Sequence, residues 1–396
     1  MKIELPKDGA RWKDSLLVRS LAIVHLAAAF ACAAEPPIQL ASPLDFQVVQ
    51  RRTRAQGTVI VAGTVLPAGN QELPPDQLEA RLIGKDLPGQ WQPLPFDPRV
   101  SAFRGELAAP AGGWYRLEIR ALRRGATVAS ASVEHVGVGE IFVVAGQSNS
   151  ANYGEERQTN QTGLVTVYDG FSWRPAGDPE PGAEGQGGSF LPPFGDIMAT
   201  RFHVPIGLVA TGIGGTSVRE WLASGVRFTN PPTVTHNVVT VGPGQWESTG
   251  AIFRNFSARL RQLGPHGFRA VLWHQGESDA HQADPERTLA GECYRQLLRR
   301  LIGDTRREIG WEVPWFVAQA TYHIPSDVSS PDIRAAQKAL SDSGAALAGP
   351  DSDALTGEMR ANHGTEVHLS GPGLRAHGLL WAEKVGPWLE EQLNDH

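Results

Sequence analysis

Residues 139–149 read Gly-Glu-Ile-Phe-Val-Val-Ala-Gly-Gln-Ser-Asn, and the pattern of the sequence changes at this stretch. Five apolar residues, 141–145, follow one another without a polar break, and a glycine and a polar turn come next. Similar unbroken runs recur at 206–210, 270–273 and 315–318. Runs of this kind are typical of strands buried on both faces, and therefore of a parallel sheet.

Helix-like segments separate these runs. A helix is expected from Pro331, and another from about Pro372 to Leu393. The alternation predicts a doubly wound α/β domain over residues 139–396, in which ligands bind at the carboxyl ends of the strands. Apolar residues at a four-residue spacing predict one face of a further helix, and the cysteine on this face would be a core residue rather than a reactive thiol. These residues are Leu289, Cys293, Leu297 and Leu301.

The region before this domain has a different pattern. Residues 36–138 alternate polar and apolar side chains in short runs, separated by glycine and proline. Strands at this spacing, without helical stretches between them, predict a small β-sandwich.

Composition excludes several classes of protein. The chain has 396 residues, with 36 Lys and Arg against 42 Asp and Glu, for a net charge of -6. Without a basic excess, nucleic acid is not an expected partner. Two cysteines rule out a disulfide scaffold or a cysteine-built metal cluster, and no apolar stretch is long enough to predict a membrane span. The sequence does not indicate an oligomeric state.

The first 34 residues have the order of a secretory signal peptide. Five basic residues lie before an apolar run, 21–34, which ends in the small residues Ala31-Cys32-Ala33. Charge, apolar run and cleavage site in this order predict export to the periplasm or the extracellular space. A buried N-terminal helix is the structural alternative, and a lipid anchor on Cys32 is disfavoured because Ala29 suits such a site poorly.

Two of the predicted strands end in segments that suit acyl chemistry. Ser148 follows a strand and a glycine, a place that exposes a nucleophilic hydroxyl at the ligand-binding edge of a sheet. The alternative is that Ser148 or Asn149 merely caps the next helix. After the strand at 206–210, glycines at 212, 214 and 215 let the backbone approach a ligand, and a bare N–H there can bind an oxyanion. The competing interpretation of these glycines is a flexible connection.

Two further segments complete the set. His274-Gln275-Gly276-Glu277 ends the strand at 270–273 and offers an amide and a carboxylate, but lacks the spacing of known metal motifs. His368 lies just before the last helix, where hydrolytic α/β enzymes carry their base. His363 is its nearby competitor.

Together, these four segments resemble the SGNH hydrolase superfamily, and within it the sialate O-acetylesterase-like branch related to carbohydrate esterase family six. The resemblance covers residues 139–390 and rests on the order of the motifs: 146–149, 214–216, 274–278 and His368. It implies a flavodoxin-like α/β/α domain, preceded by a small β-sandwich, that hydrolyses acetyl esters on sugar hydroxyls without a cofactor or a metal.

The resemblance also implies residue roles. Ser148 would attack the acyl carbon and His368 would act as the base. The backbone N–H groups of Ser148 and Gly215, with the Gln275 side chain, would form the oxyanion hole.

One position departs from the family pattern. The superfamily usually has an aspartate three residues before the histidine, where this chain has Thr365. Glu366 and Glu277 are both candidates for the acid that orients His368, and the sequence leaves the choice open. The alternative function is a carbohydrate-binding protein of the same fold that has weak or no turnover, with Thr365 as the mark of that loss.

Overall fold

The first β-rich region forms two sets of strands around one core. The computed structural model describes residues 38–66, 74–85 and 87–394. One antiparallel sheet has the order β1-β3-β7-β6, and β4, β5 and β8 join a second sheet that includes β9. Buried residues alternate with exposed ones along β7 and with partly buried ones along β3, so one face of each strand faces the core. The bounds are β1 Ile38–Ser42, β2 Gln47–Gln50, β3 Gln56–Val65, β4 Gln77–Ile83, β5 Gln92–Leu94, β6 Phe96–Asp97, β7 Ala102–Pro110 and β8 Gly112–Arg123.

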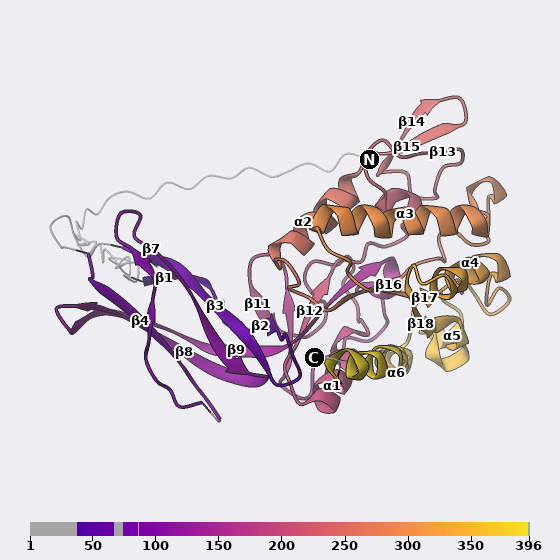
Figure 1. The fold of residues 1–396 in the computed structure, drawn as a ribbon. Helices are drawn as coiled ribbons and strands as arrows, with labels where there is room; N and C mark the ends of the chain where they lie inside the picture. The colour runs from indigo at the N-terminus through magenta and orange to yellow at the C-terminus, as the bar shows by residue number, and fades with distance from the viewer. Residues whose placement is uncertain (1–37, 67–73, 86, 395–396) are drawn as a thin grey trace, which may run out of the picture. The chain divides into compact units, whose positions relative to one another are not determined.

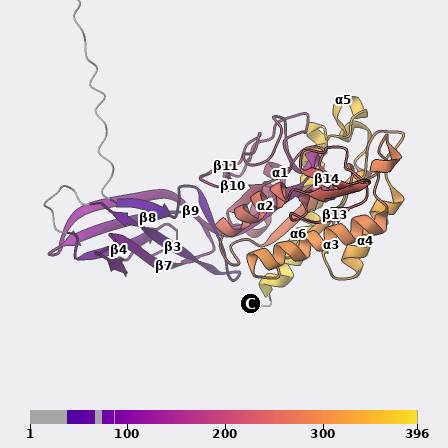
Figure 2. The same ribbon diagram turned by 90° about the horizontal axis from the view of Figure 1, so that it is seen from above.

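One long strand joins this region to the second one. β9, Ala126–Gly146, pairs with β8 and β2 over its first part and with β12 and β16 over its last part. All of its residues from 136 onward are buried. The predicted domain boundary between 138 and 139 therefore falls inside a continuous strand (Figure 1 and Figure 2). The division of the chain into two domains stays a prediction.

The second region is built on a mostly parallel sheet, so the chain has a mixed α/β fold as the sequence predicts. The strand order is β11-β10-β12-β9-β16-β17-β18, with β11 antiparallel at one edge. Numbered along the chain, the five strands from β12 to β18 have the order 2-1-3-4-5 of doubly wound sheets. The bounds are β10 Val165–Tyr168, β11 Trp173–Pro175, β12 Ile206–Ala210, β16 Ala270–His274, β17 Trp315–Gln319 and β18 Leu347–Asp351.

Helices cover both faces of this sheet, which explains its unbroken apolar strands (Figure 1). Phe142 and Val144 of β9 share one hydrophobic cluster with α1 and α6. Val143 shares the other with α2, α3 and α4. The helix bounds are α1 Leu191–Phe202, α2 Ala251–Gln262, α3 Gly291–Ile309, α4 Pro331–Asp342, α5 Ala361–Gly364 and α6 Gly371–Asn394.

The predicted helices from Pro331 and Pro372 are confirmed as α4 and α6, but the expected apolar face of α3 is wrong in part. Leu289 precedes α3, and the residues buried most deeply are Tyr294, Leu298, Leu301 and Ile302. Cys293 and Leu297 lie at the edge of this face, partly buried against the core. A helix has 3.6 residues per turn, so a strict four-residue spacing drifts off the buried face.

Short elements complete the described chain. A three-stranded antiparallel sheet has the order β13-β15-β14. No helix in the described residues is long and apolar enough to cross a membrane. The predicted signal peptide lies outside the described residues and stays a prediction. The remaining bounds are β13 Arg227–Phe228, β14 Val238–Gly242, β15 Gln245–Ser248 and 3-10 turns at Ser148–Ser150, Val218–Trp221, Pro285–Arg287, Ser352–Ala354 and Gly357–Met359.

Candidate active site

Ser148 lies where β9 leaves the sheet. Gly146 ends the strand with φ +127°, and a Cβ atom there would lie 2.0 Å from the His274 carbonyl oxygen of the neighbouring strand. Only glycine allows this close approach. Gln147 N then donates to the same carbonyl oxygen over 2.9 Å, and a 3-10 turn begins at Ser148. Gln147 holds the capping position of this turn, so Ser148 is not a helix cap.

The four motifs of the sequence meet around one cavity of about 430 Å³. Ser148 from the end of β9 and His368 from the loop before α6 both line it, although no direct hydrogen bond joins these two described side chains. Catalytic contacts are often long before substrate binds. The lining residues are Gln147, Ser148, Tyr153, Gly214, Gly215, Glu277, Ser278, Gln282, His323, Val367 and His368.

His368 is held by its neighbours on both sides. Its ring stacks on Tyr153, with the ring centres 5.4 Å apart. The carbonyl oxygen of Val367, just before it, accepts hydrogen bonds from Arg360 Nη1 at 2.6 Å and from Asn149 Nδ2 at 3.2 Å. Burial lowers the pKa of His368 and the charge of Arg360 lowers it further, against the opposite pull of nearby carboxylates. As the pH falls, His368 therefore stays a neutral imidazole to a lower pH than an ordinary histidine does.

The competing histidine is placed differently. His363 is exposed in the short helix α5, has a left-handed backbone conformation with φ +57°, and does not line the cavity.

The two candidate acids have contrasting surroundings. Glu277 is buried, and its Oε1 atom accepts from Asn149 Nδ2 at 3.1 Å and lies 3.0 Å from His274 Nε2. Burial alone raises the pKa of Glu277, but His274 and these hydrogen bonds hold that pKa at about 2. The Oε2 atom is buried and has no partner among the described residues. Glu366 and Thr365 are both exposed, and neither lines the cavity.

The predicted oxyanion donors are brought together only in part. Gly215 lines the cavity beside Ser148 and has a left-handed backbone with φ +67°, which suits glycine. Gln275 is fully buried and does not line the cavity. Its Nε2 atom donates to Asp279 Oδ2 at 2.8 Å and lies 3.2 Å from both the Thr216 carbonyl oxygen and Gln147 Oε1. The Gln275 amide therefore braces the glycine loop and is not directed at the cavity.

Sequence reasoning missed several residues of the site. Tyr153 lies four residues beyond the first motif, and nothing in its spacing marks it as a ring that contacts His368. His323, which follows β17, also lines the cavity. Its Nε2 atom donates to the Glu277 carbonyl oxygen at 2.6 Å, and its Nδ1 atom lies 3.0 Å from Asp327 Oδ2. Its position just past the end of a parallel strand was the available signal.

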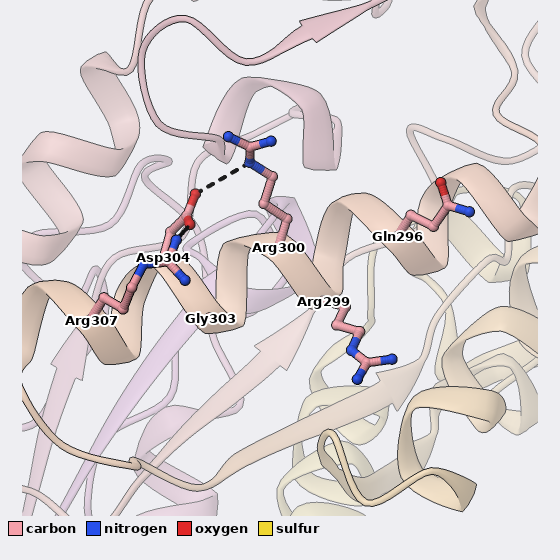
Figure 3. A pocket seen from close by; sticks show the side chains of 6 residues that line it. All are labelled: Gln296, Arg299, Arg300, Gly303, Asp304 and Arg307. Carbon is pink, nitrogen blue, oxygen red and sulfur yellow. Dashed lines mark hydrogen bonds and ion pairs between the residues drawn. The ribbon is translucent and has the colours of Figure 1, made fainter.

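A second hollow lies elsewhere and lacks such chemistry. It follows the exposed side of α3, has a volume of about 400 Å³, and three of its six lining residues are arginines (Figure 3). Arg300 and Arg307 both pair with Asp304 there. It contains neither a nucleophile nor a base, so the candidate site is the cavity of Ser148.

The sequence matches a family model over residues 138–385, and this family is described as carbohydrate esterase, sialic acid-specific acetylesterase. The chain belongs to this family. The matched segment begins in β9 and contains every residue of the Ser148 cavity. Family membership supports carbohydrate esterase chemistry for this site, and agrees with the resemblance drawn from the sequence motifs.

One solved structure shows a similar fold. A carbohydrate acetylesterase from Xanthomonas citri is 18% identical, with a TM-score of 0.53, covering 87% of this chain and 74% of that one. A protein from Arabidopsis thaliana is 20% identical, with a TM-score of 0.42, covering 62% and 96%. The protein NanS is 15% identical, with a TM-score of 0.42, covering 64% and 98%. No curated protein has a sequence that matches this chain significantly.

Proposed function

We propose that this protein is a serine-dependent O-acetylesterase that acts on acetylated carbohydrates through an acyl-enzyme. The observation that carries the proposal is the shared cavity of Ser148, His368 and Glu277, which come from three distant parts of the chain. Family membership supplies the substrate class, and the cavity supplies the nucleophile, the base and an acid for that chemistry.

In this reaction one base accepts a proton twice and gives it up twice. Ser148 Oγ attacks the acetyl carbonyl carbon while neutral His368 accepts the hydroxyl proton. The backbone N–H of Gly215, with that of Ser148, binds the negative oxygen of the tetrahedral intermediate. The C–O bond to the sugar then breaks, and the sugar oxygen takes the proton from His368. Water, deprotonated by His368, attacks the acetyl-serine, and acetate leaves as Ser148 recovers its proton.

Glu277 is the acid that we assign to this mechanism. It is ionised, buried and at the wall of the cavity, and its Oε2 atom has no partner within the part of the chain that the structure describes. An acid in this role orients the histidine and stabilises the imidazolium that forms. Glu366 is exposed, so solvent screens its charge. This choice accounts for Thr365, because an acid supplied from the β16 motif makes the usual aspartate unnecessary.

The wider architecture follows from the same proposal. We infer that residues 139–396 form a flavodoxin-like domain of the SGNH type, with a small β-sandwich at 36–138 before it. The 2-1-3-4-5 strand order and the shared core of the N-terminal strands support this division. An exported protein with a cleaved leader at 1–34 fits the charge and apolar pattern of those residues.

Hydrolysis of p-nitrophenyl acetate tests the central claim. The Ser148→Ala variant is expected to lose at least about 10³-fold in kcat. Ser278→Ala is the matched control, because Ser278 lines the same cavity, and it is expected to stay within about threefold of the wild type. Equal rates for wild type and Ser148→Ala would instead favour a carbohydrate-binding protein without turnover. Acetylated xylan, acetylated monosaccharides and O-acetyl sialic acid, assayed in parallel, identify the substrate.

A further inference from the structure

A chain of buried rings adjoins Glu277, and none of its three members is among the residues that line the cavity. His274 Nε2 lies 3.0 Å from Glu277 Oε1, and His274 Nδ1 lies 3.0 Å from His377 Nε2. Trp381 Nε1 donates to the same His377 Nε2 atom over 3.1 Å. His377 and Trp381 are fully buried on α6, and His274 is 1% exposed at the end of β16. Because solvent does not reach these groups, their protons are fixed by the partners they face.

The indole determines the tautomer of His377. An indole N–H only donates, so His377 Nε2 must present its lone pair to Trp381. A neutral His377 then carries its proton on Nδ1, an atom that is buried and has no partner among the described residues. Burial lowers the pKa of His377 well below its ordinary value, and the charges of His274 and Arg360 lower it further. His377 is therefore a neutral acceptor.

The tautomer of His377 determines the protons of His274. A second nitrogen lone pair directed at His377 Nε2 would repel it, so His274 Nδ1 must carry a hydrogen. The other ring nitrogen, Nε2, faces the Glu277 carboxylate, which only accepts. Both ring nitrogens of His274 consequently carry hydrogen.

We propose that His274 carries a hydrogen on each ring nitrogen, forms a buried ion pair with Glu277 and acts as a positioning residue for the base His368. Its charge keeps Glu277 ionised. Together with Asn149 it occupies the Oε1 atom, whereas Oε2 has no partner among the described residues. The role in positioning His368 rests on the proposed function, whereas the proton count of His274 does not.

Other charged or titratable groups surround this pair from several elements. Each of them influences the protonation of His274 and Glu277, so the pH dependence expected for His274→Gln is that of His274 with these neighbours in place. These groups are His377 on α6, Tyr294 on α3, Arg360 before α5 and His368 before α6.

Histidine ring ¹⁵N–¹H NMR of the full-length wild-type protein at neutral pH tests the proton count directly. We expect two protonated nitrogens in the His274 ring and one, Nδ1, in the His377 ring. The His274→Gln and His377→Gln variants assign the signals. A bare nitrogen in the His274 ring would overturn the proposal, whatever the activity of the protein.

Kinetics of His274→Gln test the role in positioning. Glutamine keeps a hydrogen-bond donor but removes the charge, so the pKa of Glu277 should rise. We expect kcat for p-nitrophenyl acetate to fall at least tenfold with little change in KM, and the acid limb of kcat/KM to move up by about one pH unit. His266→Gln, at an exposed position near the other end of β16, is the control and should leave both unchanged.

The outcomes separate the two proposals. A fall in kcat with no movement of the acid limb would reduce His274 to a structural role and refute the positioning claim. If His274→Gln fails to fold, the NMR spectrum of the wild type still decides the charge. Undiminished turnover in Ser148→Ala would refute the proposed function but would leave the His274 proton count standing.

Discussion

Asn149 and Glu277 are 128 residues apart in the chain, yet Asn149 Nδ2 donates to Glu277 Oε1 over 3.1 Å. The same nitrogen lies 3.2 Å from the carbonyl oxygen of Val367, the residue before His368. One amide thus connects the segments that carry the proposed nucleophile, the proposed acid and the proposed base. A side chain that donates twice inside a buried network is costly to remove, because both acceptors lose a partner.

The first prediction concerns the acid. Glu277→Gln is expected to lower kcat on p-nitrophenyl acetate by at least about 100-fold, because the imidazolium of His368 loses its support. Glu366→Gln, its matched control in the loop beside His368, is expected to stay within about threefold of the wild type. Steady-state kinetics of both variants decide the assignment, and a larger loss in Glu366→Gln would reverse it.

The second prediction concerns the pH profile. Burial and Arg360 lower the pKa of His368, so the neutral base should persist, and with it the activity, below pH 6.5. Removing the positive charge in Arg360→Met should raise the pKa of His368. As the pH is lowered, the variant should then lose activity at a higher pH than the wild type does. We expect the acid limb of kcat/KM to move up by about half a pH unit or more.

Arg360→Lys is the control for this prediction, because it keeps the charge while it changes the hydrogen bonds to Leu355, Ser352 and Val367. Its acid limb should stay near that of the wild type even if kcat falls. An identical limb in Arg360→Met and in the wild type would show that the charge of Arg360 does not reach the base.

The third prediction concerns the turn that presents Ser148. An alanine at position 146 would need φ +127° and would bring its Cβ atom to 2.0 Å from a backbone oxygen of β16. Gly146→Ala should therefore cost more than about 3 kcal/mol of stability, or separate β9 from β16 and abolish activity.

Gly125→Ala is the matched comparison for this turn. Gly125 also has a positive φ, +79°, but has open space around it, so its replacement should cost only about 1 kcal/mol. Thermal unfolding and turnover of the two variants provide the measurement. Equal losses in both would mean that crowding at Gly146 is unimportant.

The parts of the fold that could be predicted are those with a strong local pattern. The strands β12, β16 and β17 are unbroken apolar runs, because helices cover both faces of the sheet. β18, Leu347–Asp351, was not predicted because glycine, proline and aspartate interrupt its run. Helices α1 and α2 were also missed, and the face of α3 was misjudged by treating four residues as one turn.

The residues of the site also fall into those that a local sequence pattern marks and those that only packing brings together. Ser148 and His368 could be found because each stands next to a recognisable boundary between elements. The choice between Glu277 and Glu366 depends on burial, which the spacing along the chain does not determine. His377 and Arg360 lie in segments with no motif, and only the packing of α6 and of the loop before α5 brings them to the site.

The last prediction concerns stability rather than catalysis. Glu180 is 1% exposed in the loop before α1, and neither of its carboxylate oxygens has a hydrogen-bond partner among the described residues. Burial raises the pKa of Glu180 from 4.5 to about 8, and Asp178 raises it as well, while Arg174 at 3.9 Å offsets only part of the effect. The folded protein therefore holds a proton that the unfolded chain releases above about pH 4.5.

An acid with a raised pKa in the folded state stabilises folding at low pH, and this stability is lost as the pH rises from about 4.5 to about 8. Each unit of pKa difference is worth about 1.4 kcal/mol, so the loss reaches the order of a few kcal/mol. Glu180→Gln cannot ionise, so its melting temperature should exceed that of the wild type at pH 8.5 and match it more closely at pH 5.5. Glu358→Gln, at an exposed position, is the control and should follow the wild type at both values. A melting temperature difference between Glu180→Gln and wild type that does not grow with pH would show that Glu180 is ionised, or is reached by solvent, throughout this range.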